Sequence, residues 1–193
     1  KNIQANTTVN FILKEAATSM TLDLIELDVT SVLVNGNATT FTYSSPKIYI
    51  TLPALEVGSS VEVSVAYNGT PLPDPQWGGF YFIGEYAFNL GVGFASDPHN
   101  FGRAWFPCFD NFTDRAIYYT NVTVDSSYKA YANGYLTETI DNGDQTTTFK
   151  WTMDEPIPTY LVSVAIAKYE EVVMNVNDIP VILTSLAKDT ANL

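Results

Sequence analysis

Alternation of apolar and polar residues, with a period of two, is the feature that most constrains how this chain can fold. The stretches Ile48–Leu52 and Val61–Tyr67 alternate strictly, and similar stretches recur about every ten residues with turn residues between them. Their β-branched and aromatic side chains suit a pleated surface with one buried face. The pattern therefore predicts a single all-β domain over residues 1–193, an antiparallel β-sandwich with long loops.

Local signals add detail to this prediction. Asp141-Asn142-Gly143-Asp144 separates two alternating stretches and predicts a hairpin turn, because the further oxygen ligands of a calcium loop are missing. A second, aromatic hairpin is predicted around Gly84-Glu85. Tyr160–Ile166 is almost continuously apolar, which predicts a strand buried on both faces.

Composition excludes several classes of function. The chain has 21 acidic and nine basic residues, for a formal charge of −12, and the basic residues are scattered along it. No stripe of them could neutralise a row of phosphates, so we expect no nucleic-acid partner. No run of 18 apolar residues exists, so we expect no membrane span. The 13% of aromatic residues distinguishes the chain from an acidic disordered protein.

The histidine and cysteine counts limit the chemistry of the chain. An H-E-x-x-H zinc motif needs two histidines one helical turn apart, and His99 is the only histidine. The single cysteine, Cys108, excludes an internal disulfide and a Cys-based zinc site, and its apolar neighbours predict a buried thiol. We therefore expect no metal site and no catalytic residue in this chain, which leaves binding, shaping or support.

A glycine-flanked loop carries the best candidates for substrate binding. Two interpretations are open: its polar side chains contact a substrate, or the loop is solvated and Arg103 pairs with Asp110 or Asp114. The four candidates are Asp97, His99, Asn100 and Arg103.

A group of aromatic residues between Trp77 and Phe88 is the second candidate. It could stack on sugars or peptides, form a satellite core beneath the loops, or be a surface that another domain covers. The group consists of Trp77, Phe80, Tyr81, Phe82, Tyr86 and Phe88.

Five N-x-Ser/Thr sequons and the acidic composition favour an exported protein, whether periplasmic, extracellular or on the cell surface, with a cytoplasmic location as the alternative. The start of the chain lacks the apolar core of a signal peptide, so we expect that a leader was removed or the chain trimmed. The sequons begin at Asn6, Asn37, Asn68, Asn111 and Asn121.

Three short sequence motifs follow one another along the chain: Phe106-Pro107-Cys108-Phe109-Asp110, then Asn133-Gly134, then Pro158-Thr159-Tyr160-Leu161-Val162. Upstream lie Tyr67-Asn68-Gly69 and Gly79-Phe80-Tyr81. Together these segments resemble the N-terminal domain of the aminopeptidase N family of zinc metallopeptidases (gluzincins), and the similarity covers essentially the whole chain. Asn111-Phe112 stands where the family has Glu-Pro, which indicates a divergent branch.

The resemblance implies a saddle-like, multi-sheet β domain that docks against a thermolysin-like catalytic domain absent from this chain. In the family, the loop before the Pro-Cys-Phe-Asp segment supplies a polar residue beside the amino terminus of the bound peptide. Asp97 is the best match, since a carboxylate makes charge-assisted hydrogen bonds to an ammonium group. The motif residues implied to be structural are Pro107, Cys108, Phe109, Asp110, Asn133, Gly134, Thr159 and Tyr160.

The expected function is that of a non-catalytic N-terminal domain of a zinc aminopeptidase, which shapes and caps the active-site cleft and helps recognise the peptide amino terminus. The partners implied are the chain's own catalytic domain, which would carry the zinc, and a peptide substrate. An exposed apolar patch is expected where that domain docks. Two alternatives are a free-standing module that binds glycans or proteins through Trp77–Phe88, and a scaffold whose parent has lost its zinc motif.

Overall fold

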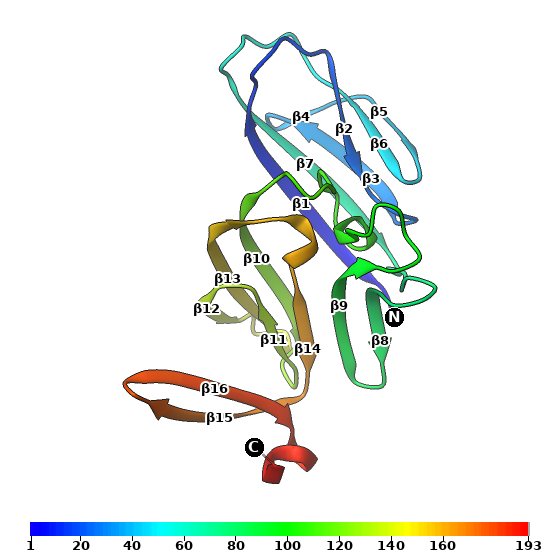
Figure 1. Ribbon diagram of the computed structural model, residues 1–193. Helices are drawn as coiled ribbons and strands as arrows, with labels where there is room; N and C mark the ends of the chain where they lie inside the picture. Colours follow the sequence, from blue (N-terminus) through cyan, green and yellow to red (C-terminus); the bar gives the residue numbers. More distant parts are fainter. Residues whose placement is uncertain (193) are drawn as a thin grey trace. The chain divides into compact units, whose positions relative to one another are not determined.

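Strands make up nearly all of the regular structure in the computed structural model, which describes residues 1–192 (Figure 1). The predicted all-β fold with several antiparallel sheets is confirmed. The chain forms two compact units. The first comprises residues 1–81, 90–115 and 157–162, and the second comprises 82–89, 116–156 and the chain from 163 onward. Within the described range, no helix is long and apolar enough to cross a membrane.

Two antiparallel sheets build most of the first unit, with strand orders β1-β7-β3-β4 and β2-β6-β5. Val61, Val63 and Val65 are buried and alternate with more exposed residues along β7, and Ile48 and Ile50 do the same on β6. Each sheet thus has one buried face, as the alternation predicts. The strands are β1 (Ile3–Ile12), β2 (Ser19–Asp23), β3 (Asp28–Val34), β4 (Asn37–Ala38), β5 (Phe41–Ser44), β6 (Lys47–Thr51) and β7 (Ser60–Gly69).

Strands β8 (Gly78–Ile83) and β9 (Tyr86–Gly93) form the predicted aromatic hairpin. Residues 82–89 at its tip belong to the second unit, and the rest of the hairpin belongs to the first. Beyond β9 the chain follows a long loop into the 3₁₀ turn η1 (Gly102–Ala104), and a second turn, η2 (Thr159–Leu161), completes the first unit. These loops carry most of the candidate binding residues.

The second unit contains a sheet of order β10-β13-β12 and a sheet in which β11 and β14 join the tips of β9 and β8. The indole of Trp151 on β13 donates to the carbonyl of Ala130 on β11 at 3.0 Å and so connects the two sheets. Asp141–Asp144 forms the predicted turn between β12 and β13. The elements are β10 (Ala116–Asp125), β11 (Lys129–Ala132), β12 (Tyr135–Asp141), β13 (Thr146–Ile157) and β14 (Val164–Ala167).

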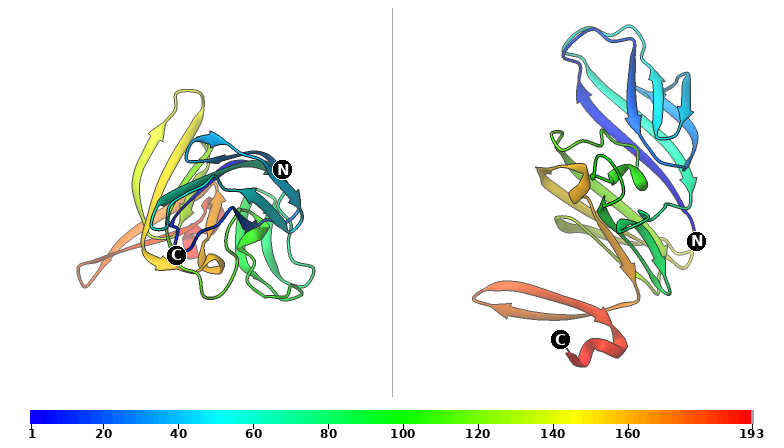
Figure 2. Two further views of the ribbon diagram at one scale, coloured as in Figure 1. Left: turned by 90° about the horizontal axis from the view of Figure 1, so that it is seen from above. Right: turned by 45° about the vertical axis from the view of Figure 1, so that its right-hand side comes forward.

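The last hairpin of the second unit forms a sheet of its own, as the right-hand view of Figure 2 shows. It consists of β15 (Tyr169–Val176) and β16 (Ile179–Leu186) and is followed by η3 (Ala187–Asn192). Its turn residues Asn177 and Asp178 both have positive φ, 51° and 63°, which is the backbone of a type I′ turn. This tight turn fixes the register that pairs Val176 with Ile179.

The prediction of one strand over Tyr160–Ile166 is wrong. Residues 159–161 form η2 instead, in which Leu161 N donates to Pro158 O at 3.0 Å and Val162 N donates to Thr159 O at 3.1 Å. Strand β14 begins only at Val164, whose amide donates to Asn89 Oδ1 at 2.7 Å. The predicted burial on both faces also fails, because Leu161 is 47% exposed. An apolar run does not by itself specify the backbone of a segment.

Two glycines in the second unit allow a test of how closely the backbone of Thr152 approaches Gly134. Gly134 and Gly143 both have positive φ, 84° and 76°, but a Cβ on Gly134 would lie 1.8 Å from the carbonyl oxygen of Thr152, whereas a Cβ on Gly143 would meet nothing within 4 Å. We expect Gly143→Ala to lower the free energy of unfolding by about 1–2 kcal/mol, the cost of a left-handed backbone. Gly134→Ala should cost at least about 2 kcal/mol more, because the Cβ overlaps the facing strand. Urea unfolding of both variants measures the difference, and equal losses would contradict the close approach.

Candidate functional site

The loop that carries the predicted binding residues is fixed at its base and open at its tip. Gly93 N donates to His99 O at 2.8 Å and Phe101 N donates to Gly91 O at 2.7 Å, so the two arms of the loop are paired. Asp97 and His99 are exposed at the tip, and His99 Nδ1 lies 3.1 Å from Gly93 O. The exposed tip therefore carries one carboxylate and one imidazole.

The other two candidates lie in the interior. Asn100 is fully buried, and its side-chain amide has no hydrogen-bond partner among the described residues. The Arg103 side chain is 9% exposed, and its guanidinium donates to the carbonyl oxygens of Pro98 and Asn100. These two residues therefore shape the loop rather than contact a ligand at its surface.

A buried ion pair holds Arg103 in this position. Arg103 Nη1 and Asp110 Oδ2 lie 2.9 Å apart, and the Asp110 side chain is fully buried. The backbone amide of Arg103 donates to the same oxygen at 3.1 Å, and the hydroxyl of Thr159 donates to Asp110 Oδ1 at 2.6 Å. Of the two partners predicted for Arg103, the structure selects Asp110. This carboxylate joins the loop, the Pro-Cys-Phe-Asp segment and η2.

The Pro-Cys-Phe-Asp segment also pairs with strand β2. Asp23 and Cys108 exchange two backbone hydrogen bonds, of 2.8 and 3.2 Å, and the Asp110 amide donates to Asp23 Oδ2 at 3.2 Å. Cys108 is buried, as predicted, beside Pro107, and Phe109 is half-buried. Burial and the nearby charges of Asp110 and Asp23 raise the pKa of the Cys108 thiol. The thiol is therefore protonated and inert at neutral pH.

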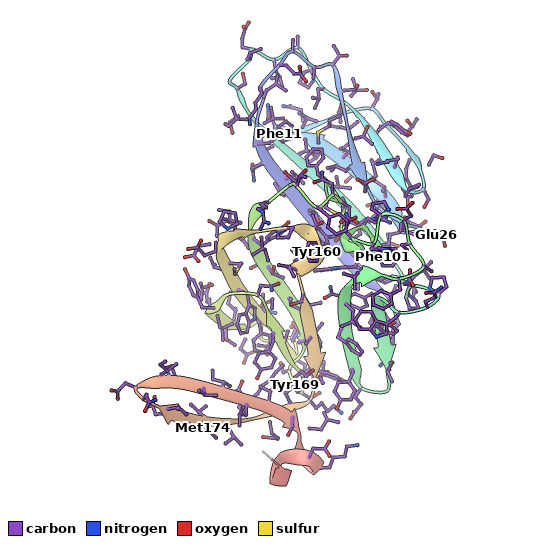
Figure 3. The ribbon with its side chains drawn as sticks, in the orientation of Figure 1. Phe11, Glu26, Phe101, Tyr160, Tyr169 and Met174 are labelled. Carbon is purple, nitrogen blue, oxygen red and sulfur yellow. The ribbon has the colours of Figure 1, made fainter. Side chains whose placement is uncertain are left out.

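The remaining family landmarks also make structural contacts. In the second unit, Asn133 Oδ1 accepts a hydrogen bond of 2.6 Å from Ser163 N, and Gly134 makes the turn into β12. In the first unit, the ring of Tyr160 packs edge-on against Phe112, with centroids 5.6 Å apart. Figure 3 labels Tyr160 and Phe101 among the side chains of this region.

The aromatic residues from Trp77 to Phe88 do not all pack together. Trp77 is 45% exposed and contacts Phe94 at 4.9 Å, whereas Phe80 is buried and contacts Trp105 at 6.1 Å. Tyr86 instead packs against Tyr169, in the second unit. These three members of the group therefore have aromatic partners on different segments of the chain.

Asp74 organises the neighbouring loop and was missed by the sequence reasoning. It is buried, and Oδ1 accepts hydrogen bonds from the amides of Gln76, Trp77 and Ala95 at 2.9–3.1 Å. Its Oδ2 accepts the hydroxyl of Ser96 at 2.8 Å. Burial opposes ionisation, but these four donors outweigh it and hold the pKa of Asp74 below its usual range. The Pro73-Asp74-Pro75 sequence, a turn signal, could have identified it.

Hairpin β15–β16 presents apolar side chains to solvent. By register, Val172 faces Leu183, Met174 faces Val181 and Val176 faces Ile179, so six apolar residues share one face, here called the apolar hairpin face (Met174 is labelled in Figure 3). Ile179 is 64% exposed, and on the opposite face Val173 is equally exposed. An isolated two-stranded hairpin is marginally stable in water. This surface is the candidate for the exposed apolar patch that the resemblance predicts.

Potential metal ligands are dispersed. Within residues 1–192, no group of three His, Cys, Asp or Glu side chains is arranged to hold a metal ion.

A sequence profile of the Peptidase M1 N-terminal domain matches residues 1–161. Among solved structures, the M1 zinc metallopeptidase of Deinococcus radiodurans is similar to this chain, with 25% identity and a TM-score of 0.79 over 90% of this chain and 39% of the other. A mutant of that enzyme bound to a Tyr-Ser-Ala substrate gives a TM-score of 0.80 at 25% identity, covering 96% of this chain and 44% of the other.

Curated relatives include transcription initiation factor TFIID subunit 2 of Danio rerio, 28% identical over 58% of this chain, and that of Gallus gallus, 30% identical over 50%. The chain spans about a tenth of the length of these relatives. It thus corresponds to one part of larger proteins.

The buried ion pair predicts a large effect of one substitution. Asp110→Asn should lower the free energy of unfolding by about 3–5 kcal/mol, because it leaves the Arg103 charge buried without its partner. Glu138→Gln is the control, since it removes an exposed pair with Lys150 at 2.8 Å, which should contribute about 1 kcal/mol or less. Denaturant unfolding tests both, and a loss for Asp110→Asn no larger than the control's would show that the pair does not stabilise the loop.

The lowered pKa of Asp74 predicts a pH dependence. Because the folded pKa lies below the unfolded one, the contribution of Asp74 is fully present above the unfolded pKa of about 3.9 and is lost as the pH falls through the folded pKa. In Asp74→Asn this contribution is absent at every pH. The stability difference between wild type and variant should therefore be large at about pH 7 and shrink below about pH 4. Thermal unfolding across this range measures it, and a difference independent of pH would contradict the assignment.

Proposed function

The chain belongs to the Peptidase M1 N-terminal domain family, and we propose that it is the non-catalytic N-terminal domain of a zinc-dependent aminopeptidase. In this role it shapes and caps the active-site cleft and helps recognise the amino terminus of the peptide. The zinc would be held by a part of the protein outside these 193 residues, where it would activate water to attack the first peptide bond. An exported location, proposed from the sequons, is compatible with this role.

The position of Asp97 is the observation that supports amino-terminus recognition. Its exposed carboxylate stands at the tip of a loop whose base is fixed by the buried pair of Arg103 and Asp110. A carboxylate held in this way can accept charge-assisted hydrogen bonds from an ammonium group without ordering a mobile loop first. The exposed His99 beside it offers a second polar contact.

The apolar hairpin face supports docking of a further domain. The solved relatives are more than twice as long as the part that this chain covers, and one of them is described as a two-domain metallopeptidase. Burial of Ile179 and its neighbours would stabilise both the hairpin and the contact, at about 25 cal/mol for each Å² of apolar surface. We assign this surface to the catalytic domain of the same protein.

A scaffold is the second candidate function. The curated relatives at 25–30% identity are named as subunits of a transcription initiation factor. In that alternative the domain would use the same apolar hairpin face to assemble with other proteins, and the protein would have no zinc-dependent activity. The independent glycan-binding module has less support, because the aromatic residues from Trp77 to Phe88 divide among different partners.

Kinetics of the protein that contains the catalytic domain test the proposal. Asp97→Asn should raise KM for peptides with a free amino terminus by about tenfold or more, the cost of losing a charge-assisted hydrogen bond, with a smaller effect on kcat. Asp28→Asn, an exposed carboxylate at the start of β3, is the matched control. An unchanged KM would contradict the role of Asp97.

Assays of the 193-residue chain alone provide a second test of the proposed function. It should show no zinc-dependent peptide hydrolysis, and turnover that a chelator abolishes would overturn the non-catalytic assignment. If the longer protein also lacks zinc and activity while it assembles with other proteins, the scaffold function replaces the peptidase.

A further inference from the structure

Two exposed aromatic rings pack against each other in the first unit, and one of them belongs to the loop that carries Asp97. The ring centroids of Trp77 and Phe94 lie 4.9 Å apart, yet Trp77 is 45% exposed and Phe94 is 58% exposed. The backbone amide of Phe94 donates to the carbonyl oxygen of Trp77 at 3.0 Å, so the two segments are joined as well as the rings. These two residues are here called the exposed aromatic pair.

The buried carboxylate of Asp74 fixes the backbone that carries the exposed aromatic pair. Its Oδ1 accepts the amide of Trp77 at 3.1 Å and the amide of Ala95, the residue after Phe94, at 3.0 Å. Its Oδ2 accepts the hydroxyl of Ser96 at 2.8 Å. Because the backbone beneath both rings is fixed, a ligand that contacts them has little chain to order, which lowers the cost of binding.

Phe94 and Asp97 lie in one small closed loop. Gly93 N donates to His99 O at 2.8 Å, and Ser96 N donates to Gly93 O at 3.3 Å, so the loop folds back on itself. Three residues of fully extended chain span at most about 11 Å, so the Cα atoms of Phe94 and Asp97 lie closer together than that. The loop therefore carries a bare aromatic ring and a carboxylate a short distance apart.

The exposed aromatic pair and Asp97 together match the first residue of a peptide. That residue carries an ammonium group and a side chain on one carbon atom, so it needs a charged and an apolar contact close together. Asp97 is exposed and can accept charge-assisted hydrogen bonds from the ammonium group. The exposed rings offer the apolar surface against which a large side chain is removed from water.

A basic side chain fits this surface less well than an apolar one. Residues 74–78 and 93–99 contain two carboxylates, Asp74 and Asp97. Asp74 is buried and already accepts four hydrogen bonds, and Asp97 is assigned to the ammonium group, so neither is left to pair with lysine or arginine. The two rings also pack on each other, tilted at 46°, which occupies part of the faces that a cation would need.

We propose that the exposed aromatic pair binds the apolar side chain of the peptide's first residue while Asp97 binds its ammonium group. The proposal rests on the proposed function and specifies the substrate class, which is peptides that begin with a large apolar residue. Aromatic contacts of this kind change an affinity by roughly threefold to tenfold. Trp77 and Phe94 are in this way specificity-determining residues.

Nuclear magnetic resonance of the 193-residue chain tests the contact directly. Each of its three tryptophans gives one indole N–H signal, and titration with the peptide Phe-Ala-Ala should move that of Trp77. The buried N–H of Trp105 and the N–H of Trp151, which donates to Ala130, are internal controls that should not move. Ala-Ala-Ala and Lys-Ala-Ala should bind at least about threefold more weakly. A Trp77 signal that stays in place, or equal affinity for the three peptides, would overturn the proposal.

The acetylated peptide separates the aromatic contact from the role of Asp97. Acetylation of Phe-Ala-Ala at its amino terminus removes the ammonium charge and should weaken binding by about tenfold or more. If the affinity is unchanged by acetylation while Ala-Ala-Ala still binds more weakly, the aromatic contact stands and the proposed role of Asp97 is overturned.

Kinetics of the protein that contains the catalytic domain give the second test. Phe94→Ala should lower kcat/KM for peptides that begin with phenylalanine or leucine by roughly threefold to tenfold, and leave that for peptides that begin with alanine within about twofold. Tyr49→Ala is the matched control, since it removes an aromatic ring that is 51% exposed on β6 of the same unit. An equal loss for both classes of peptide would assign Phe94 a structural role and overturn the proposal.

The same kinetics distinguish failure of this inference from failure of the proposed function. If the longer protein hydrolyses peptides and wild type and Phe94→Ala show the same preference among first residues, the proposed function stands and this inference alone is overturned. If it hydrolyses no peptide, the proposed function is overturned and this inference with it.

Discussion

The buried ion pair between Arg103 and Asp110 is the interaction on which the loops of the first unit depend. Two charges removed from water are tolerable only if hydrogen bonds satisfy their remaining positions. Here Thr159 satisfies one oxygen of Asp110, and the carbonyls of Pro98 and Asn100 accept from Arg103. Segments far apart in sequence therefore meet at one carboxylate. This buried ion pair therefore also fixes the geometry of the exposed tip of the loop.

The strands of the sheets could be predicted because the alternation that specifies them lies within each short stretch of sequence. Strands β6 and β7 of the first unit bury one face, so their alternation is visible in the sequence, as along Val61–Tyr67. The segment Tyr160–Ile166 failed because its course depends on distant residues. Thr159 bonds Asp110, and Val164 bonds Asn89, which lies 75 positions away in the chain. The hydrophobic pattern of the segment itself does not indicate those contacts.

The loop that carries the candidate residues was predictable from the sequence, but the orientation of its side chains was not. His99 and Asn100 are neighbouring polar residues, yet one is exposed and the other fully buried. The isolated bridge between Val92 and Asn100 turns the amide inward and leaves the preceding imidazole outside. A bridge between the arms of a loop is a tertiary contact, so sequence alone identified the loop without separating the residues that shape it from those it exposes.

The contacts of the aromatic residues also could not be predicted from their positions in the sequence. Trp77, Phe80 and Phe88 lie close in sequence, but their neighbours are set by the sheets: Phe80 meets Trp105, and Phe88 stands across Ala165 from Tyr131. On hairpin β15–β16, no charged residue interrupts the apolar hairpin face, although charges are the usual protection of an uncovered strand pair. A β protein that leaves such a face bare risks association with other chains. The absence of that protection from this face is consistent with a surface that is covered in the working protein.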